Sequence, residues 1–402
     1  MANVTQLKHL EHLEDEMLNY GVEGCKAAVS FLQELRKMLG CDNSTGFMQT
    51  KWDGAPAVVC GREPITGAFF VGTKSVFNKT DPKKCFTIDD VERYYGGGDL
   101  ALKLKESLIH FYTLGIEGVI QGDLLFTSSD KKVETIHGER LITFRPNTIT
   151  YGIPVDHPMG KEIAAAKIGI VFHTSYKGKS LQDAQAVAGV DIGKFNKNSD
   201  IAVINNDTPM HKVGLNHQEE VKFDGHVKTI EEMCGKCGDF LDELVTNTGK
   251  TGDQRWHVAS YLKPFFNDEI KSARTINNAD TAFENLYNFY YDKTTPMLNK
   301  IKTESTKAQK SKLVHNSQNY LRDNSGKFKY MLGLYKELQT VKQMVIDKLD
   351  HLETFRTFAQ TDKGYKVTGP EGYVLHKDGD MIKFVNRLEF SYINFTLAKQ
   401  WR

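Results

Sequence analysis

The feature that most constrains the fold is a change of pattern along the chain that later reverses. Over residues 46–180, short β-rich segments such as AFFVGT and GVIQGDLLF are separated by turn residues. Over 181–365 this signal fades, and apolar residues at helical spacing replace it. The β texture returns in GYVLH and DMIKFVNRLEF, within 366–402. The pattern predicts an α+β domain of mainly antiparallel sheets, built from both β-rich stretches and interrupted by a large all-α insertion.

Helical patterns also stand at the start of the chain and inside the predicted insertion. Residues 1–45 contain two apolar repeats at helical spacing, and they predict a helical segment packed on the β-rich domain. The clearest helix is predicted over 333–358, where leucines and valines recur every three or four residues. We interpret this stripe as the seam of a helical bundle, with a partner-binding face as the alternative.

Composition excludes several classes of protein. The 402 residues include no long apolar run and begin with a polar, acidic stretch, so neither a membrane span nor a secretory signal is expected. The net charge is +1, so contact with nucleic acid requires a local basic patch. Six cysteines are few for this length and predict reduced thiols in a cytoplasm.

Several charged side chains interrupt otherwise apolar β-rich segments. KWDG places Lys51 and Asp53 between two strand-like stretches, and QGDLLF places Asp123 inside an apolar strand. Near the end of the chain, Glu371 precedes GYVLH, and Lys383 lies between apolar neighbours. Burying a charge is costly unless it is paired or bound to a ligand, so these residues are candidates for a functional site. For Asp123 alone, a capping or surface position is the alternative.

The order of these segments resembles that of the covalent nucleotidyltransferase superfamily, which comprises ATP-dependent DNA and RNA ligases and mRNA capping enzymes. KWDG resembles the nucleophile motif, QGDLLF the Gly-acid-Leu motif, and IVFHTSY the aromatic strand that follows it. EGYVLH resembles the Glu-Gly-hydrophobic motif, and IKFVNRLEF the terminal lysine motif. The likeness is closest to phage RNA ligase-like proteins and covers roughly 45–180 and 366–392. It implies a ligase adenylation domain, unrelated to the ATP-grasp fold.

The resemblance implies a role for each candidate residue. Lys51 attacks the α-phosphate of ATP and forms a lysyl-AMP, Asp53 orients the lysine, and Lys383 neutralises the α-phosphate. The implied nucleotide-binding residues are Lys51, Gly54, Lys74, Asp123, Phe172, Glu371 and Lys383, with Phe172 stacking on adenine. Glu371 and Asp123 bind Mg²⁺, or Mn²⁺ as a second choice, because these ions prefer oxygen ligands. From the residues alone, a place in the apolar core is the alternative for Phe172.

The chain departs from the family pattern in three places. APAVV follows KWDG where many members have an Arg or Asn. Val385 stands where the terminal motif usually has a second lysine, and Arg387 is the candidate substitute. Only 17 residues follow Val385, so no C-terminal OB-fold is expected there. That absence favours the RNA ligase type over DNA ligases and capping enzymes.

A lysine-rich run in the predicted insertion is the candidate surface for nucleic acid. NKIKTESTKAQKSK contains Lys300, Lys302, Lys307, Lys310 and Lys312, and aromatic residues precede it. A solvated helix face is the alternative. The single CGKC pair offers too few ligands for zinc, and the glycine-rich YYGGGDL lacks the Gly-Lys-Ser/Thr of a phosphate-binding loop.

Together these expectations describe a monomeric, ATP-dependent RNA ligase that joins 3′-OH and 5′-phosphate ends through a lysyl-AMP. It is expected in the cytoplasm, or in the host cytoplasm if the chain is phage-encoded. Its expected partners are ATP and nucleic acid, with RNA favoured over DNA, and no membrane. Two alternatives stay open: a DNA nick ligase that uses the helical insertion as a clamp, and a binding protein of the same fold that joins no ends.

Overall fold

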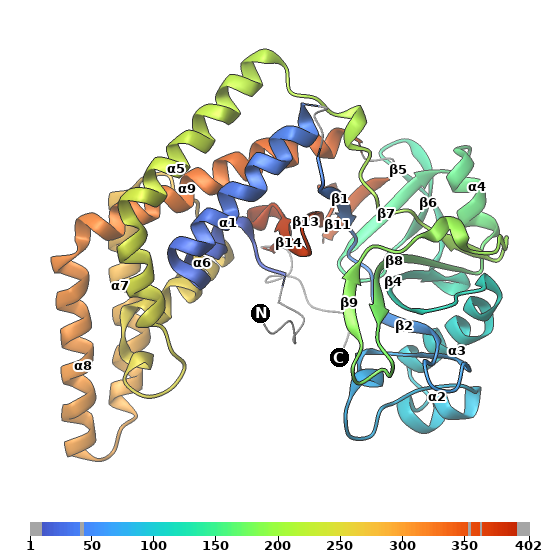
Figure 1. The fold of residues 1–402 in the computed structure, drawn as a ribbon, viewed down its shortest axis with the longest axis horizontal. Coiled ribbons are helices and arrows are strands. Elements are labelled where there is room, and N and C mark those ends of the chain that lie inside the picture. Colours follow the sequence, from blue (N-terminus) through green and yellow to red (C-terminus); the bar gives the residue numbers. More distant parts are fainter. Residues whose placement is uncertain (1–9, 41–43, 353–354, 362–363, 392–402) are drawn as a thin grey trace.

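A computed structural model of the chain describes residues 10–40, 44–352, 355–361 and 364–391. In this part of the molecule the long helices gather at one end and most strands at the other (Figure 1). The sheets are mainly antiparallel, which confirms the predicted mixture of helices and antiparallel sheets. None of the helices in these residues is both long and apolar enough to cross a membrane.

The two β-rich stretches of the chain meet in a three-stranded antiparallel sheet. Its order is β1 (Phe47–Lys51), β13 (Gly372–Lys377) and β14 (Asp380–Phe384). Lys51 is opposite Gly372, and Val374 is opposite Lys383. Successive side chains of a strand point to opposite faces, so this sheet has one apolar and one polar face. The apolar face packs into the core of the helices, whereas Lys51 and Lys383 lie on the other face.

A larger sheet forms the centre of the strand-rich end. Its order is β10 (Ile201–Val203), β8 (Ile168–Lys177), β4 (Val119–Thr127), β2 (Ala57–Arg62) and β3 (Phe69–Gly72), and β9 (Gln185–Ala188) pairs with β8. Only the pairing of β10 with β8 is parallel among these strands. Helices α2 (Ile88–Tyr95) and α3 (Asp99–Phe111) cover one face, through a core that includes Leu104, Ile120 and Phe172. Asp123 and His173 meet on the opposite face.

A five-stranded antiparallel sheet completes this end of the molecule. Its order is β12 (Gly364–Val367), β11 (Arg356–Thr361), β7 (Ile149–Pro154), β6 (Glu139–Phe144) and β5 (Lys132–Ile136), with α4 (Pro158–Ala165) against β6 and β7. Trp52 of the KWDG segment packs against Tyr151 and Phe355 and shares their core with Val171 of β8. The segment after Lys51 is therefore held between the two larger sheets.

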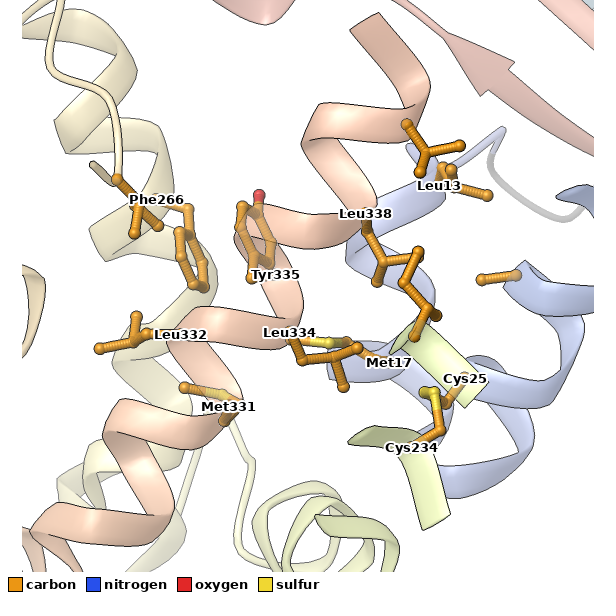
Figure 2. Close-up of a cluster of buried hydrophobic side chains, with 14 of the residues drawn as sticks. Leu13, Met17, Cys25, Cys234, Phe266, Met331, Leu332, Leu334, Tyr335 and Leu338 are labelled. Carbon is orange, nitrogen blue, oxygen red and sulfur yellow. A yellow bond between two sulfur atoms is a disulfide. The ribbon is translucent and has the colours of Figure 1, made fainter. Parts of the chain in front are cut away.

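The long helices pack around one apolar core. They are α1 (Glu16–Leu39), α5 (His217–Thr246), α6 (Leu262–Lys271), α7 (Ala279–Asn299), α8 (Glu304–Asp323) and α9 (Ser325–Leu349). Helix α1 lies along α5, and a disulfide joins Cys25 to Cys234 between them (Figure 2). The apolar stripe of α9, which includes Leu334, Leu338 and Val341, is fully buried in this core. The predicted seam of a helical bundle is therefore confirmed, although the helix ends at Leu349 and β11 begins inside the predicted range 333–358.

The structure corrects two expectations about this part of the chain. Helix α5 begins at His217 and not near residue 181, because β9 and β10 come first; each has only three or four residues, too few for a clear strand pattern. Helix α1 packs along α5, shares the core of the helices and also contacts β13 of the β-rich domain. Cys25 and Cys234 are oxidised, against the expectation of reduced thiols. Expectations for 1–9 and 392–402 lie outside the described residues.

A buried network of charges joins both ends of the described chain to the helices. Lys342 on α9 pairs with Glu14 at 2.5 Å, and Arg387 pairs with Asp15 at 3.1 Å. These four residues are all more than nine-tenths buried. The hydroxyl of Tyr335 donates to Asp15 at 3.1 Å and accepts from Arg387 at 2.8 Å. Because a lone buried charge is costly, each of these residues requires its partner.

Lys342→Ala is expected to lower the free energy of unfolding by about 3 kcal/mol, because it removes the nearest partner of the buried Glu14 carboxylate and leaves it with Arg387 at 3.7 Å. Urea-induced unfolding followed by circular dichroism measures the change. Lys348→Ala is the matched control, since Lys348 lies on the same helix and its ion pair with Glu219 is at the surface. The control should have a much smaller effect. Equal destabilisation by both substitutions would contradict the role of the buried pair.

Candidate functional site

Lys51 is the last residue of β1, and its side chain meets Glu371 from the neighbouring segment. The Lys51 Nζ and Glu371 Oε1 atoms form an ion pair. The pairing follows from the strand register, because Lys51 is opposite Gly372, the residue after Glu371. Gly372 has a φ of 144°, and a side chain there would meet the carbonyl oxygen of Phe384 at 2.4 Å. Glycine is therefore required where Lys51 and Glu371 meet.

Asp53 fixes the loop that follows Lys51. Its carboxylate accepts hydrogen bonds from Asn147 Nδ2 at 2.8 Å and from the backbone N–H groups of Thr148 and Ile149 at 2.6 and 2.8 Å. Its own backbone N–H donates to the Tyr151 hydroxyl at 2.8 Å. Because three donors bind the Asp53 carboxylate, Asp53 positions the loop that carries Lys51. The Asp53 oxygens are already hydrogen-bonded within the protein.

Asp123 approaches the same loop from the middle of β4. A side chain at Gly54 would lie 2.6 Å from the Asp123 Cβ atom, so the glycine of KWDG lets the loop pack directly on β4. His173 Nε2 lies 3.6 Å from Asp123 Oδ2 on the same face of the sheet. With Asp53 and Glu371, Asp123 gives Lys51 three carboxylate neighbours, all of which act on its charge.

Burial and these charges set the protonation of the cluster. Burial raises the pKa of Glu371 to about 7, with Lys51 opposing the rise and with Asp53 and Asp123 adding to it. Burial lowers the pKa of Lys51, but the charges of Glu371, Asp123 and Asp53 outweigh it, and the net shift is upward. Lys51 is therefore held as a cation, while Glu371 gains or loses its proton near neutral pH.

Lys383 is the second cation of the cluster. It lies on β14, opposite Val374, on the same face of the three-stranded sheet as Lys51. Burial lowers the pKa of Lys383, and the positive charge of Lys51 lowers it further. The positive charge of Lys51 therefore acts on Lys383, and both charges attract an anionic group on this face of the sheet.

Phe172 lies away from this cluster. Its side chain is 1% exposed, and its ring packs edge-on against Phe111 and Phe195 at centroid distances of 5.8 and 5.6 Å. These rings belong to the core on the helix-covered face of the six-stranded sheet, whereas Asp123 meets His173 on the other face. Stacking of Phe172 on an adenine beside Lys51 is therefore wrong for this structure, because the sheet itself separates them.

Arg387 does not take the place of the missing second lysine. Its guanidinium donates to Asp15 at 3.1 Å, to Tyr335 at 2.8 Å and to Asn267 at 2.7 Å, inside the buried network. Val385, which stands at the position of that lysine, is 3% exposed and shares an apolar core with Trp52. Neither residue therefore brings a cation to Lys51.

The other predicted binding lysines lie farther out. Lys74 is exposed and begins a short 3-10 helix after β3, the edge strand of the six-stranded sheet. Lys300 follows α7, Lys302 comes next, and Lys307, Lys310 and Lys312 lie on α8. Helix α8 lies at the far end of the helices, whereas the β1–β13–β14 sheet lies near the middle of the molecule (Figure 1). Lys310 is paired with Asp253 at 3.0 Å. A nucleic-acid contact on α8 stays a prediction.

Two histidines join the cluster, although the motif resemblance assigns neither of them a role. His173 is the extra residue of a bulge between β8 and β4, and it meets Asp123 on the face opposite to Phe172. Because side chains alternate along a strand, the residue after Phe172 is expected on the opposite face, and this pattern points to His173. His12 forms a parallel bridge with Lys383. No local pattern points to His12, because its position depends on a pairing across most of the chain.

The carboxylates fit a divalent cation only in part. Among the residues that the structure describes, no group of three or more His, Cys, Asp or Glu side chains is arranged to hold a metal ion. Mg²⁺ commonly uses one or two protein carboxylates and takes its other ligands from phosphates and water. Asp53 is already bound by three donors, so Glu371 and Asp123 are the two acids that suit an ion shared with a nucleotide.

Comparison with known protein families gives one match. A family model described as "Family of unknown function (DUF6267)" matches residues 3–399. The chain belongs to this family. The match spans the N-terminal helix, the sheets and the bundle of helices together, so the helices between the two β-rich stretches are part of the family's pattern. No curated protein and no solved structure matches the chain.

Glu371→Gln is expected to remove part of the pH dependence of stability. Folding raises the pKa of Glu371 from 4.5 to about 7, so its stabilising contribution is full below about pH 4.5 and is lost as the pH rises through 7. The unfolding free energy of the wild type, minus that of the variant, should fall by up to about 3 kcal/mol over this range. Urea unfolding across this range measures it, and a constant difference would contradict the raised pKa.

Proposed function

We propose that this chain is an ATP-dependent polynucleotide ligase of the RNA ligase type that acts through a covalent lysyl-AMP. The observation that supports this proposal is the meeting of Lys51, Glu371 and Lys383 in one cluster with Asp123. More than 300 residues separate the first from the last. These are the residues to which the motif resemblance assigns the nucleophile, two acids and the second cation. Strand register brings them together, which is an argument separate from motif order.

In the proposed first step, the Lys51 Nζ atom attacks the α-phosphorus of ATP. A P–N bond forms, the bond from the α-phosphorus to the bridging oxygen breaks, and pyrophosphate leaves with the electron pair. Lys51 must first lose a proton. Glu371 is the carboxylate in contact with it, and its pKa of about 7 suits a general base near neutral pH. Lys383 places a positive charge where negative charge grows on the α-phosphate.

The surrounding residues hold this geometry. Asp53 anchors the loop that carries Lys51, and Gly54 lets the loop lie against Asp123. Glu371 and Asp123 would hold Mg²⁺ together with the phosphates of ATP. When bound, Mg²⁺ withdraws charge from the phosphate oxygens.

In the later steps, AMP passes from Lys51 to the 5′-phosphate of one nucleic-acid end. The P–N bond breaks and Lys51 leaves as an amine; the 3′-OH of the other end then displaces AMP and forms the phosphodiester bond. The lysines on α8 are the proposed binding surface for the nucleic acid. Because α8 lies at the far end of the helices and the β1–β13–β14 sheet lies near the middle of the molecule, a substrate that contacts both must extend along the helices (Figure 1).

Incubation with Mg²⁺ and α-labelled ATP should give a covalent, acid-labile adenylate on the wild type and none on Lys51→Ala. The label requires the amine that attacks the α-phosphorus. Lys132→Ala is the control, because Lys132 is exposed on the five-stranded sheet, and it should keep the label. Intact mass and peptide mapping locate the adduct. Absence of label from ATP, GTP and NAD on the wild type would sink the enzyme hypothesis and leave a binding protein.

A panel of nicked duplexes separates the two ligase types. The wild type should seal nicks with RNA strands faster than the same nicks in all-DNA duplexes, as the RNA ligase type requires. Gel separation of labelled 5′-phosphate, adenylated and joined strands measures each step. Equal sealing of all-DNA nicks would overturn the RNA preference and favour a DNA nick ligase in which the long helices act as a clamp.

A further inference from the structure

The N-terminal segment lies along the open edge of the three-stranded sheet, next to Lys383. The Lys383 backbone N–H donates to the Glu11 carbonyl oxygen at 3.0 Å, and His12 forms a parallel bridge with Lys383. Paired residues of neighbouring strands direct their side chains to the same face of a sheet. His12 therefore lies beside Lys383 on the face that also carries Lys51.

The His12 side chain is buried without a complete set of hydrogen bonds. It is 9% exposed, and among the described residues its Nδ1 atom has no hydrogen-bond partner. A buried polar atom without a partner is costly, so such an atom in a native fold calls for a ligand or a function. Burial lowers the pKa of His12 well below its usual value, and the charges of Lys342, Arg387, Lys383 and Lys51 lower it further. The imidazole is therefore neutral at physiological pH.

We propose that His12 contacts the phosphate chain of the nucleotide bound at Lys51 and Lys383, donating a hydrogen bond from its ring where the family pattern has a second lysine. This inference rests on the proposed function and adds to it a binding residue from outside the resembling motifs. Val385, directly after β14, brings no polar group to that part of the site, whereas His12 pairs with Lys383 at the edge of the same sheet.

A neutral donor suits this position better than another cation. The positive charge of Lys51 already lowers the pKa of Lys383, because like charges in a buried place repel. A further lysine would add to that repulsion before any phosphate is bound. A neutral imidazole with its proton on the unpartnered nitrogen supplies a hydrogen bond to a phosphate oxygen and adds no charge.

The buried network next to His12 explains why its position is well defined. Glu14 and Asp15 follow it within three residues and are tied to Lys342 on α9 and to Arg387 after β14. These pairs hold the N-terminal segment against β14 from one side. The ion pair with Lys342 on α9 thereby helps to keep His12 beside Lys383.

The test measures single-turnover formation of the lysyl-AMP at saturating ATP. His12→Ala should slow this step by about 100-fold, the loss typical of one hydrogen-bond donor to a reacting phosphate or carbonyl. His12→Asn keeps an N–H donor near the same place and should recover most of the rate. His137→Ala, an exposed histidine in the β5–β6 turn, should change nothing. Thermal unfolding of each variant checks that folding is retained. An unchanged rate in a folded His12→Ala would overturn the inference.

A binding measurement separates failure of this inference from failure of the proposed function. Titration calorimetry with inorganic tripolyphosphate, without metal or nucleic acid, requires no adenylation. The wild type should bind it, His12→Ala should bind at least about 10-fold more weakly, and His12→Asn should resemble the wild type. If the wild type forms no adenylate but shows this pattern, the ligase proposal falls and the phosphate contact stands. Equal binding by wild type and His12→Ala, or no binding by either, overturns the inference.

Discussion

The pairing of Glu14 with Lys342 and of Asp15 with Arg387 is the constraint on which the arrangement of the molecule depends. These four charged residues are buried, and none is stable there without its partner. They come from the N-terminal segment, from α9 and from the residues after β14, three parts of the chain that are far apart in sequence. Satisfying the charges requires these parts to meet, and their meeting fixes the edge of the three-stranded sheet against the helices.

The same sheet relates this network to the candidate site. Its apolar face completes the core of the helices, and its other face carries Lys51 and Lys383. Because side chains alternate along β1 and β14, a residue that packs in the core is followed by a residue on the face of the candidate site. The six-stranded sheet follows the same rule, with Phe172 on the helix-covered face and Asp123 on the other. Small residues at Gly54 and Gly372 let the backbones approach closely enough for the charged groups to meet.

Much of the candidate site follows from sequence because its residue types are unusual for their local pattern. Asp123 and Lys383 each interrupt an apolar strand, and Lys51 ends strand β1; such charges need partners when buried, so a shared cluster is a sound prediction. Phe172 is not unusual for its local pattern. An aromatic residue in an apolar strand suits the core as well as it suits stacking on a base. Arg387 likewise matches a functional position by spacing alone, whereas its partner is a buried carboxylate near the other end of the chain. His12 has neither an unusual context nor a motif.

The sequence by itself determined the class of elements, the interruption of the β-rich stretches by helices, and the charged residues that require partners. These properties depend on hydrophobic period and on the cost of burying charge, and both act over a few residues. Only the tertiary structure decided which face of each strand looks toward Lys51, that α1 belongs with α5, and that His12 lies beside Lys383. These outcomes depend on strand register and on pairings across hundreds of residues, and no local pattern encodes either.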